Sequence, residues 1–333
     1  GDARLGYEPF FNAFTPGSAG TPLPPDVTPA TPATGIFERR TLTSRAGATM
    51  ETHLGRRDSL SFSYTFGRQS FLDDDTGTDE ETPRVAWFGD STTHTAGASF
   101  AHTVSAGLRT RVDYSRAQTS YDGTARDGSR RESRSMRTQR LEGGLDVEHG
   151  VDRGRRLVRW NVTGGAAYVQ AQTFAERAPY AAWLPVGSAS LTVPLSDNTA
   201  FEATYRRETN LLQGVTDDVY ATDTVSANVT MALGARTSLA LHTTYANWQT
   251  PTAAGESMGL DVYGAGAQLR VLLSQSVGIT ASYGYYKHTF SNPAALPAGF
   301  PSEYGRNSVR VGLTFMLPLK RPPAPRAARA AMP

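Results

Sequence analysis

The six histidines are the residues of this chain with the most versatile chemistry, because an imidazole can bind a metal or carry a proton. His94 and His102 fall on one predicted strand, but eight residues separate them, too many for a shared metal. The others are scattered at His53, His149, His242 and His288. They form no metal-spaced pair on a helix, so we predict no metal site.

The other residue types that support catalysis or cofactor binding are also missing or unplaced. The chain has no cysteine, which excludes disulfides, thiolate zinc sites and cysteine nucleophiles. It contains no glycine-rich phosphate loop that opens a helix and no nucleophile elbow. We therefore predict no catalytic residue and no cofactor, and we expect that the protein is not an enzyme.

Composition and charge narrow the class of protein further. The 333 residues include 33 Lys and Arg against 31 Asp and Glu, a net charge of +2. This near balance argues against a nucleic-acid partner, which would require a strong basic field. Hydrophobic residues make up only 39% of the chain, too few for a large soluble core. No run approaches the roughly 18 consecutive apolar residues of a transmembrane helix, so a helical membrane protein is excluded.

The main pattern is an alternation of apolar and polar residues with a period of two, which is typical of β-strands. In residues 59–70, Leu60, Phe62 and Tyr64 share one face, and small polar residues share the other. The pattern predicts fourteen strands, most of them long enough to cross a bilayer at a tilt. They are expected at 2–14, 36–54, 59–71, 91–104, 107–119, 135–148, 156–173, 180–193, 199–211, 219–233, 237–249, 258–273, 277–290 and 305–319.

The connections between these strands alternate between shorter and longer, as expected for an up-and-down meander with short turns at one rim and long loops at the other. Since unpaired backbone groups are costly in hydrocarbon, such a sheet is expected to close on itself. We predict an all-β fold, a transmembrane up-and-down antiparallel barrel of about fourteen strands over residues 1–319. The Pro-rich segment 15–35 is predicted to be a long outer loop, and the Pro/Arg/Ala tail 320–333 to be disordered.

The last predicted strand contains the sequence Arg310-Val-Gly-Leu-Thr-Phe-Met-Leu317. It resembles the terminal β-signal of bacterial outer-membrane barrels, with Arg310, Gly312, Phe315 and Leu317 at the signal positions. The architecture resembles that of porins over nearly the whole chain. The resemblance implies a Gram-negative outer-membrane location, with short periplasmic turns and long extracellular loops. It also implies two partners, the lipid bilayer and the outer-membrane assembly machinery.

In such a barrel one face of each strand contacts lipid and the other lines the lumen. Tyrosines on the apolar face are expected to form an aromatic girdle at the headgroups: Tyr64, Tyr114, Tyr205, Tyr245, Tyr283 and Tyr285. The opposite face is too charged for an apolar core and is expected to line the lumen with Arg45, Glu51, Arg109, Arg111, Asp113, Arg140, Glu142, Asp146, Arg159, Glu202, Arg206, Gln268, Arg270 and Arg310. Inward glycines, Gly165 among them, either widen the passage or relieve strand curvature.

Three functions remain open from the sequence. The leading hypothesis is a passive channel for small polar or anionic solutes, whose mixed lumen charges predict weak ion selectivity. The second is a structural barrel in an envelope assembly, with partner proteins docked at its rims or a partner segment in its lumen. The third is the barrel part of an export system for polysaccharide or protein.

Overall fold

The computed structural model describes residues 2–9, 38–71, 90–121, 134–151, 156–172, 180–211, 219–249, 259–274, 276–291 and 302–315. These residues form fourteen strands: β1 (Asp2–Pro9), β2 (Glu38–His53), β3 (Asp58–Phe71), β4 (Ser91–Ser105), β5 (Leu108–Tyr121), β6 (Arg134–Val151), β7 (Arg156–Ala171), β8 (Tyr180–Ser196), β9 (Thr199–Leu211), β10 (Val219–Ala232), β11 (Thr237–Gln249), β12 (Gly259–Leu272), β13 (Val277–Phe290) and β14 (Glu303–Phe315). The part of the chain that the structure describes contains no helix long and apolar enough to cross a membrane.

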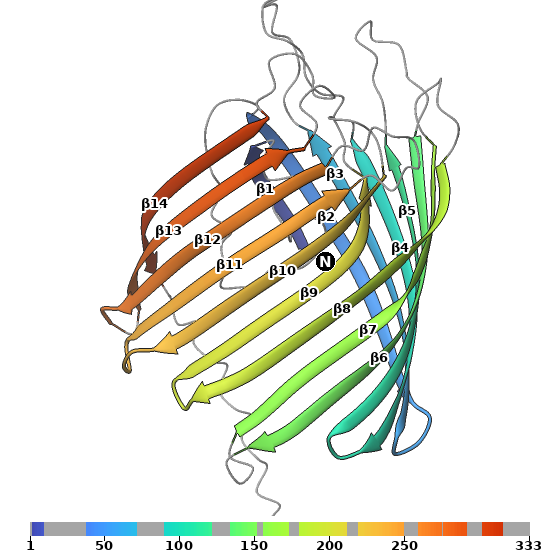
Figure 1. Ribbon diagram of the computed structural model, residues 1–333, viewed down its shortest axis with the longest axis horizontal. Coiled ribbons are helices and arrows are strands. Elements are labelled where there is room, and N and C mark those ends of the chain that lie inside the picture. Colours follow the sequence, from blue (N-terminus) through green and yellow to red (C-terminus); the bar gives the residue numbers. More distant parts are fainter. Residues whose placement is uncertain are drawn as a thin grey trace, which may run out of the picture.

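All fourteen strands belong to one sheet, in which each strand pairs antiparallel with its neighbours in sequence (Figure 1). The register shifts only twice, between Thr103 and Ser105 in β4 and between Pro194 and Ser196 in β8. The predicted number, order and direction of the strands are therefore confirmed. The strand ends agree with the predicted ranges to within a few residues wherever the structure describes them.

The two rims of the sheet differ, as the connection lengths predict. At one rim, which we call the turn rim, the strands are joined by 54–57, 106–107, 152–155, 197–198, 233–236 and 273–276. Tight backbone hydrogen bonds close several of these turns, for example from Leu54 N to Asp58 O at 3.0 Å and from Leu273 N to Val277 O at 2.9 Å. The opposite rim, with the longer connections, is called the loop rim. The predicted loop 15–35 and tail 320–333 lie outside the described residues.

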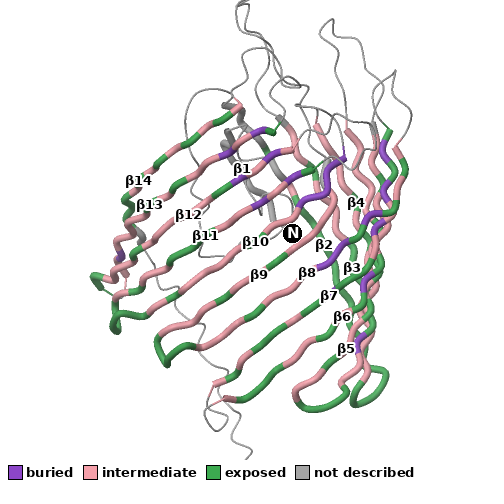
Figure 2. Tube along the Cα trace, in the orientation of Figure 1, coloured by how far each residue is buried: buried purple, intermediate pink, exposed green. Residues whose placement is uncertain are grey.

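The sheet is strongly curved, so it has a concave and a convex face (Figure 1). Large apolar side chains are exposed on the convex face, among them Phe62, Val112, Leu141, Val225 and Leu241, with exposed fractions of 40% to 54%. The buried positions of β10–β13 lie toward the loop rim (Figure 2). An exposed apolar face opposite a partly buried face is the reverse of a soluble sheet, in which apolar side chains are covered.

The sheet differs from the prediction at its two edges. Within the described part of the chain, no ladder joins β14 to β1, so the expected closure between first and last strand is not formed. β1 is short, and all eight of its residues pair with Glu38–Arg45 at the loop-rim end of β2. The edge position explains why Val309 and Val311 of β14 are 75% and 74% exposed, more than convex residues on strands paired at both edges, such as Trp183 at 68% and Leu241 at 40%.

Candidate functional site

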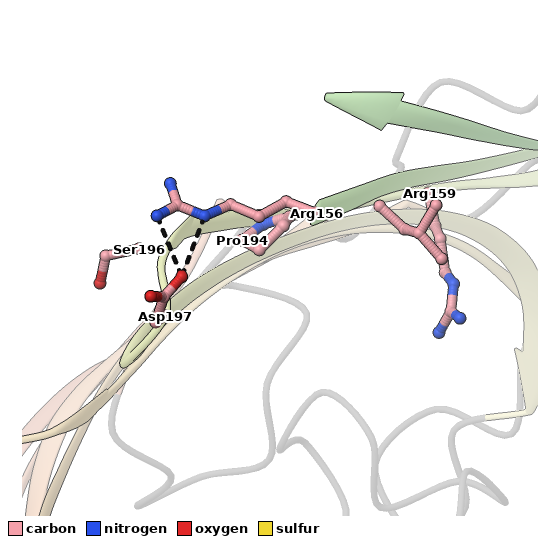
Figure 3. Close-up of a pocket in the computed structure, with 6 residues that line it drawn as sticks. Arg156, Arg159, Pro194, Ser196 and Asp197 are labelled. Carbon is pink, nitrogen blue, oxygen red and sulfur yellow. Dashed lines mark hydrogen bonds and ion pairs between the residues drawn. The ribbon is translucent and has the colours of Figure 1, made fainter. Parts of the chain in front are cut away.

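The strand register places all fourteen predicted lumen residues on one face of the sheet. Arg109 pairs with Asp146 and Asp113 with Glu142 across β5 and β6, and cross-strand partners in a sheet point to the same side. Figure 3 shows Arg159 of the same set on the inner side of the curved sheet. The concave face therefore carries this set, while the exposed apolar residues lie on the convex face.

The concave side chains of β5, β6 and β7 form a connected network around Arg111. Its Nε lies 3.2 Å from a carboxylate oxygen of Asp113, and its Nη1 lies 4.0 Å from one of Asp146. Arg111 Nη2 also donates to Asn161 Oδ1 at 3.3 Å, and the Asn161 amide in turn donates to Asp146. One guanidinium thus holds two carboxylates from neighbouring strands, which compensates part of their desolvation.

A second pair extends this network toward β8. Arg140 contacts Glu142 through two nitrogens, with Nε to Oε2 at 2.5 Å and Nη2 to Oε1 at 2.7 Å. Glu142 is only 9% exposed, and it also accepts a hydrogen bond from Thr163 Oγ1 at 3.3 Å. Thr163 and Ser188 share a further hydrogen bond of 2.8 Å. A two-point Arg–carboxylate contact is strong and fixes both side chains, so this part of the concave wall is rigid.

The remaining predicted lumen residues are not brought into this network. Arg159 pairs with Glu148 at 2.9 Å and Arg206 with Glu208 at 3.5 Å. Arg109 Nη2 donates to Ser59 Oγ at 2.9 Å. The others are spread along the same face, with Arg45 and Glu51 exposed on β2, Glu202 on β9, Gln268 and Arg270 on β12 and Arg310 on β14. Positive and negative side chains are therefore distributed over this face and are not gathered into one site.

Sequence reasoning missed several concave residues that complete these contacts. Asn161, Thr163, Ser188 and Ser59 are uncharged, and the search for lumen residues considered mainly charged ones. A signal was available, because each has the same parity along its strand as the charged residues beside it. Their partners, however, depend on the stagger between strands and not on parity.

The expectation of a polar inner face is wrong near the loop rim. There the concave face of β7, β8 and β10–β13 carries buried, mainly apolar residues, which we call the loop-end belt: Ala167, Val169, Leu184, Val186, Tyr220, Trp248, Leu260, Val262, His288 and Phe290, each 9% exposed or less. His288 stacks on Tyr304 with ring centroids 5.6 Å apart and meets Phe290 edge to face at 5.3 Å. On β11–β13 the convex face carries polar residues near the loop rim, such as Asn247, Asp261 and Lys287, so the polarity of the two faces is reversed there.

The predicted girdle tyrosines lie on the convex face, and their hydroxyl groups repeat one arrangement. Tyr205 donates to Asp223 at 2.7 Å, Tyr245 to Asp261 at 2.8 Å and Tyr283 to Asn307 at 2.7 Å. In each case the partner lies on the next strand, two residues closer to the loop rim than the residue paired with the tyrosine. Tyr64 with His94 at 2.8 Å and Tyr114 with Gln139 at 3.5 Å follow the same rule.

This row of tyrosines separates two zones of the convex face. Toward the turn rim, the convex positions of the described parts of β3–β14 carry no charged side chain until the turns themselves, where Asp58 meets His102 at 2.7 Å. From Tyr263 to Val271 this uncharged zone extends over eight residues, roughly 20 Å along the barrel axis at a typical strand tilt. That height is close to the apolar band of a transmembrane barrel. The role of the tyrosines as a girdle stays a prediction.

Three further aromatic residues belong to the same zone of the convex face and were not predicted. Tyr168 of β7 and Trp183 of β8 lie with ring centroids 5.1 Å apart, and Trp183 is 68% exposed. Tyr263 of β12 lies 4.9 Å from the Tyr245 ring. The convex residues are even-numbered in β7 and odd-numbered in β8 and β12.

The pocket in Figure 3 lies at the turn rim, between β7 and the turn that joins β8 to β9. It has a volume of about 450 Å³ and is lined by Arg156, Leu157, Arg159, Pro194, Ser196 and Asp197. Arg156 donates to Asp197 Oδ1 at 3.1 and 3.3 Å and to the Leu195 carbonyl at 3.2 Å. These contacts satisfy the arginine within the turn, and we assign no ligand to this pocket.

The predicted assembly signal falls on the last strand of the sheet. Arg310 and Gly312 lie within β14, Phe315 is its last residue and pairs with Val277, and Leu317 lies outside the described residues. The signal therefore lies on the strand whose second edge is unpaired in the described sheet. Its function in assembly stays a prediction.

No protein-family model matches this chain, and no curated protein matches it. Among solved structures, the unliganded ferric citrate transporter FecA is 12% identical with a TM-score of 0.48, covering 81% of this chain and 47% of FecA. The FrpB iron transporter from Neisseria meningitidis is 8% identical with a TM-score of 0.49, covering 78% and 46%. The copper transporter OprC is 12% identical with a TM-score of 0.47, covering 84% and 50%. The chain spans about half the length of these transporters.

Proposed function

We propose that this chain forms a barrel in the bacterial outer membrane and passes small polar or anionic solutes through its lumen. One observation carries the proposal: between the tyrosines and the turn rim the convex face is apolar and exposed, while the concave face of β5–β7 holds networks of charged side chains. Lipid is the solvent that makes this arrangement favourable, because it covers the apolar face and leaves the ions in water. Insertion by the outer-membrane assembly machinery through β14 is part of the proposal.

The charges of the lumen define the expected selectivity. The fourteen concave residues include eight arginines and five carboxylates, and Glu148 and Glu208 of the same face pair with two of the arginines. Paired charges largely cancel at a distance, so the net field on a passing ion is weak. The surplus of arginines favours anions slightly.

Conductance across a planar bilayer tests the proposal directly. We expect the wild-type protein to give steps of current with a slight preference for anions. Arg109→Glu, which reverses a concave charge, should shift the reversal potential toward cations, because ion permeation responds to charge in the passage. Arg68→Glu makes the same change on the convex face and should leave the reversal potential unchanged. A folded protein that conducts no current would contradict the proposal.

The loop-end belt favours a second function, a structural barrel whose lumen is occupied. Val169, Leu260 and Val262 are completely buried by the chain itself although they lie on the concave face, so the passage is not fully open at this level. An open water-filled passage would leave apolar side chains there exposed. A folded barrel that conducts no current in a planar bilayer, and that co-purifies with a stoichiometric partner in mild detergent, would favour this function over the channel.

Membrane insertion also makes a prediction for the free edge of β14. An unpaired backbone amide in hydrocarbon costs several kcal/mol, so this edge must find a partner strand in the bilayer. We expect the amide hydrogens of β14 that point away from β13 to exchange as slowly as those of β13 after reconstitution into vesicles. Hydrogen exchange followed by mass spectrometry measures this. Rapid exchange of these amides in folded, reconstituted protein would show that the edge faces water.

A further inference from the structure

A row of basic side chains lies on the convex face just beyond the tyrosines, on the side of the loop rim. Among the described side chains, its members are Arg68, Arg116, Arg137, Arg207 and Lys287, on β3, β5, β6, β9 and β13. In the proposed orientation this level corresponds to the outer lipid headgroups, since the tyrosine hydroxyls mark the boundary of the apolar band. Cations at that level face the phosphate groups of lipids.

Three members of the row are neutralised by the protein itself. Arg207 Nη1 lies 3.1 Å from a carboxylate oxygen of Asp223, and Lys287 Nζ lies 2.7 Å from one of Glu303. Arg68 lies 3.7 Å from Asp90. Each of these cations therefore has an anionic partner on a neighbouring strand or at its start, and it needs no external anion.

Arg116 and Arg137 differ from the other three. Both are exposed, and no carboxylate of the described residues lies within ion-pair distance of either. Arg116 pairs with Gln139 and Arg137 with Gln118, so the two arginines are diagonal neighbours on adjacent strands. Diagonal positions on one face are roughly 7 to 8 Å apart, and two long side chains can converge on one group from that separation.

The surroundings of the two arginines also suit a lipid headgroup. Tyr114 lies one position below Arg116 on the same face, and its hydroxyl bonds to Gln139 at 3.5 Å. Gln170 pairs with Arg137 across β6 and β7, and its amide donates to the Tyr168 hydroxyl at 3.3 Å. Exposed Trp183 lies against the Tyr168 ring. A lipid at this position would have aromatic rings beside the start of its acyl chains and hydrogen-bond donors beside its phosphate.

We propose that Arg116 and Arg137 together bind the phosphate of an anionic lipid in the outer leaflet. The inference rests on the proposed membrane orientation, which places both side chains at the headgroup level. Guanidinium groups are suited to this ligand because their planar donor array matches the oxygens of a phosphate. A lipid bound there would lay its acyl chains along the convex residues of β5–β7, such as Val112, Leu141 and Val162.

Native mass spectrometry of the full chain, released from an uncharged detergent, tests the inference with phosphatidic acid as the probe. We expect the double variant Arg116→Gln/Arg137→Gln to bind phosphatidic acid about tenfold more weakly than wild type, the loss of one or more charge-assisted contacts. The matched control, Arg207→Gln/Lys287→Gln, removes two basic residues of the same row that already have partners. Its affinity should stay within about twofold of wild type.

Other outcomes overturn the inference in distinguishable ways. Equal binding by both double variants, with wild type conducting in a planar bilayer, would refute the lipid site while the proposed function stands. Displacement of phosphatidic acid by equimolar inorganic phosphate would show a site for free phosphate and not for lipid. If lipids carrying a bromine quencher leave the tryptophan fluorescence of reconstituted wild type unchanged, and equally that of a variant retaining only Trp183, the membrane orientation itself is wrong.

Discussion

The Val229→Arg substitution is expected to destabilise the protein in lipid vesicles by about 2 to 4 kcal/mol, the range for a basic residue at the lipid-facing midplane of a barrel. Val229 lies on the convex face of β10 and pairs with Phe201 and Leu241, in the middle of the uncharged zone. A guanidinium there has no water and no carboxylate neighbour within the described zone. Urea unfolding of the reconstituted protein, followed by tryptophan fluorescence, measures the change in free energy of unfolding.

The adjacent residue supplies the control for this experiment. Asn228 points to the concave face of the same strand, between Glu202 and His242. Asn228→Arg places the same charge at the same height, but in a lumen that already carries arginines and beside a carboxylate. Its expected effect is within about 1 kcal/mol, as for a surface ion pair. Equal effects of the two substitutions would mean that the convex face does not contact lipid, and the proposed function would fail.

Gly165→Ala is expected to destabilise the protein by about 1 to 3 kcal/mol, the usual range for overpacking a tight site. A Cβ on Gly165 would overlap the Leu141 carbonyl oxygen and lie 2.8 Å from Glu142 Cα, so β6 and β7 would have to separate. Gly165 pairs directly with Glu142, and the separation would also disturb the Arg140–Glu142 contact. The same urea titration measures the loss.

The neighbouring glycine makes this prediction specific. A Cβ on Gly164 would meet nothing within 4 Å, and Gly164→Ala should change stability by less than about 0.5 kcal/mol, as for an unstrained surface substitution. If Gly165→Ala were as stable as Gly164→Ala, the close approach of β6 and β7 would not exist in the folded protein. The sequence interpretations of Gly165, a wider passage or relief of strand curvature, did not include this close approach of β6 and β7.

Individual strands were predictable because each one carries its own signal. In β3, Leu60, Phe62 and Tyr64 alternate with serines, and no other local structure separates the two sets so cleanly. In β12 the signal is weaker, since Gly264 and Gly266 interrupt the side chains of one face, yet its bounds still fall within one residue of the prediction. The alternation within each strand also predicted which of its residues share a face, and the register between neighbouring strands joins these faces across the sheet.

Interactions between strands were less accessible. Arg111 contacts Asp146 of β6 and Asn161 of β7. These contacts depend on the stagger between three strands, which the sequence of one strand does not specify. The loop-end belt escaped prediction for a related reason. Trp248 and Leu260 point to the concave face in strands whose convex face also carries large side chains, so parity alone gives no sign of burial.

Alternation along the chain and the lengths of the connections were sufficient to predict fourteen antiparallel strands and their order, because these properties depend only on near neighbours. The tertiary structure decided which charges meet, that part of the inner wall is covered, and that β1 and β14 share no ladder. These properties depend on stagger and curvature, which accumulate over the whole sheet and are specified by no single strand.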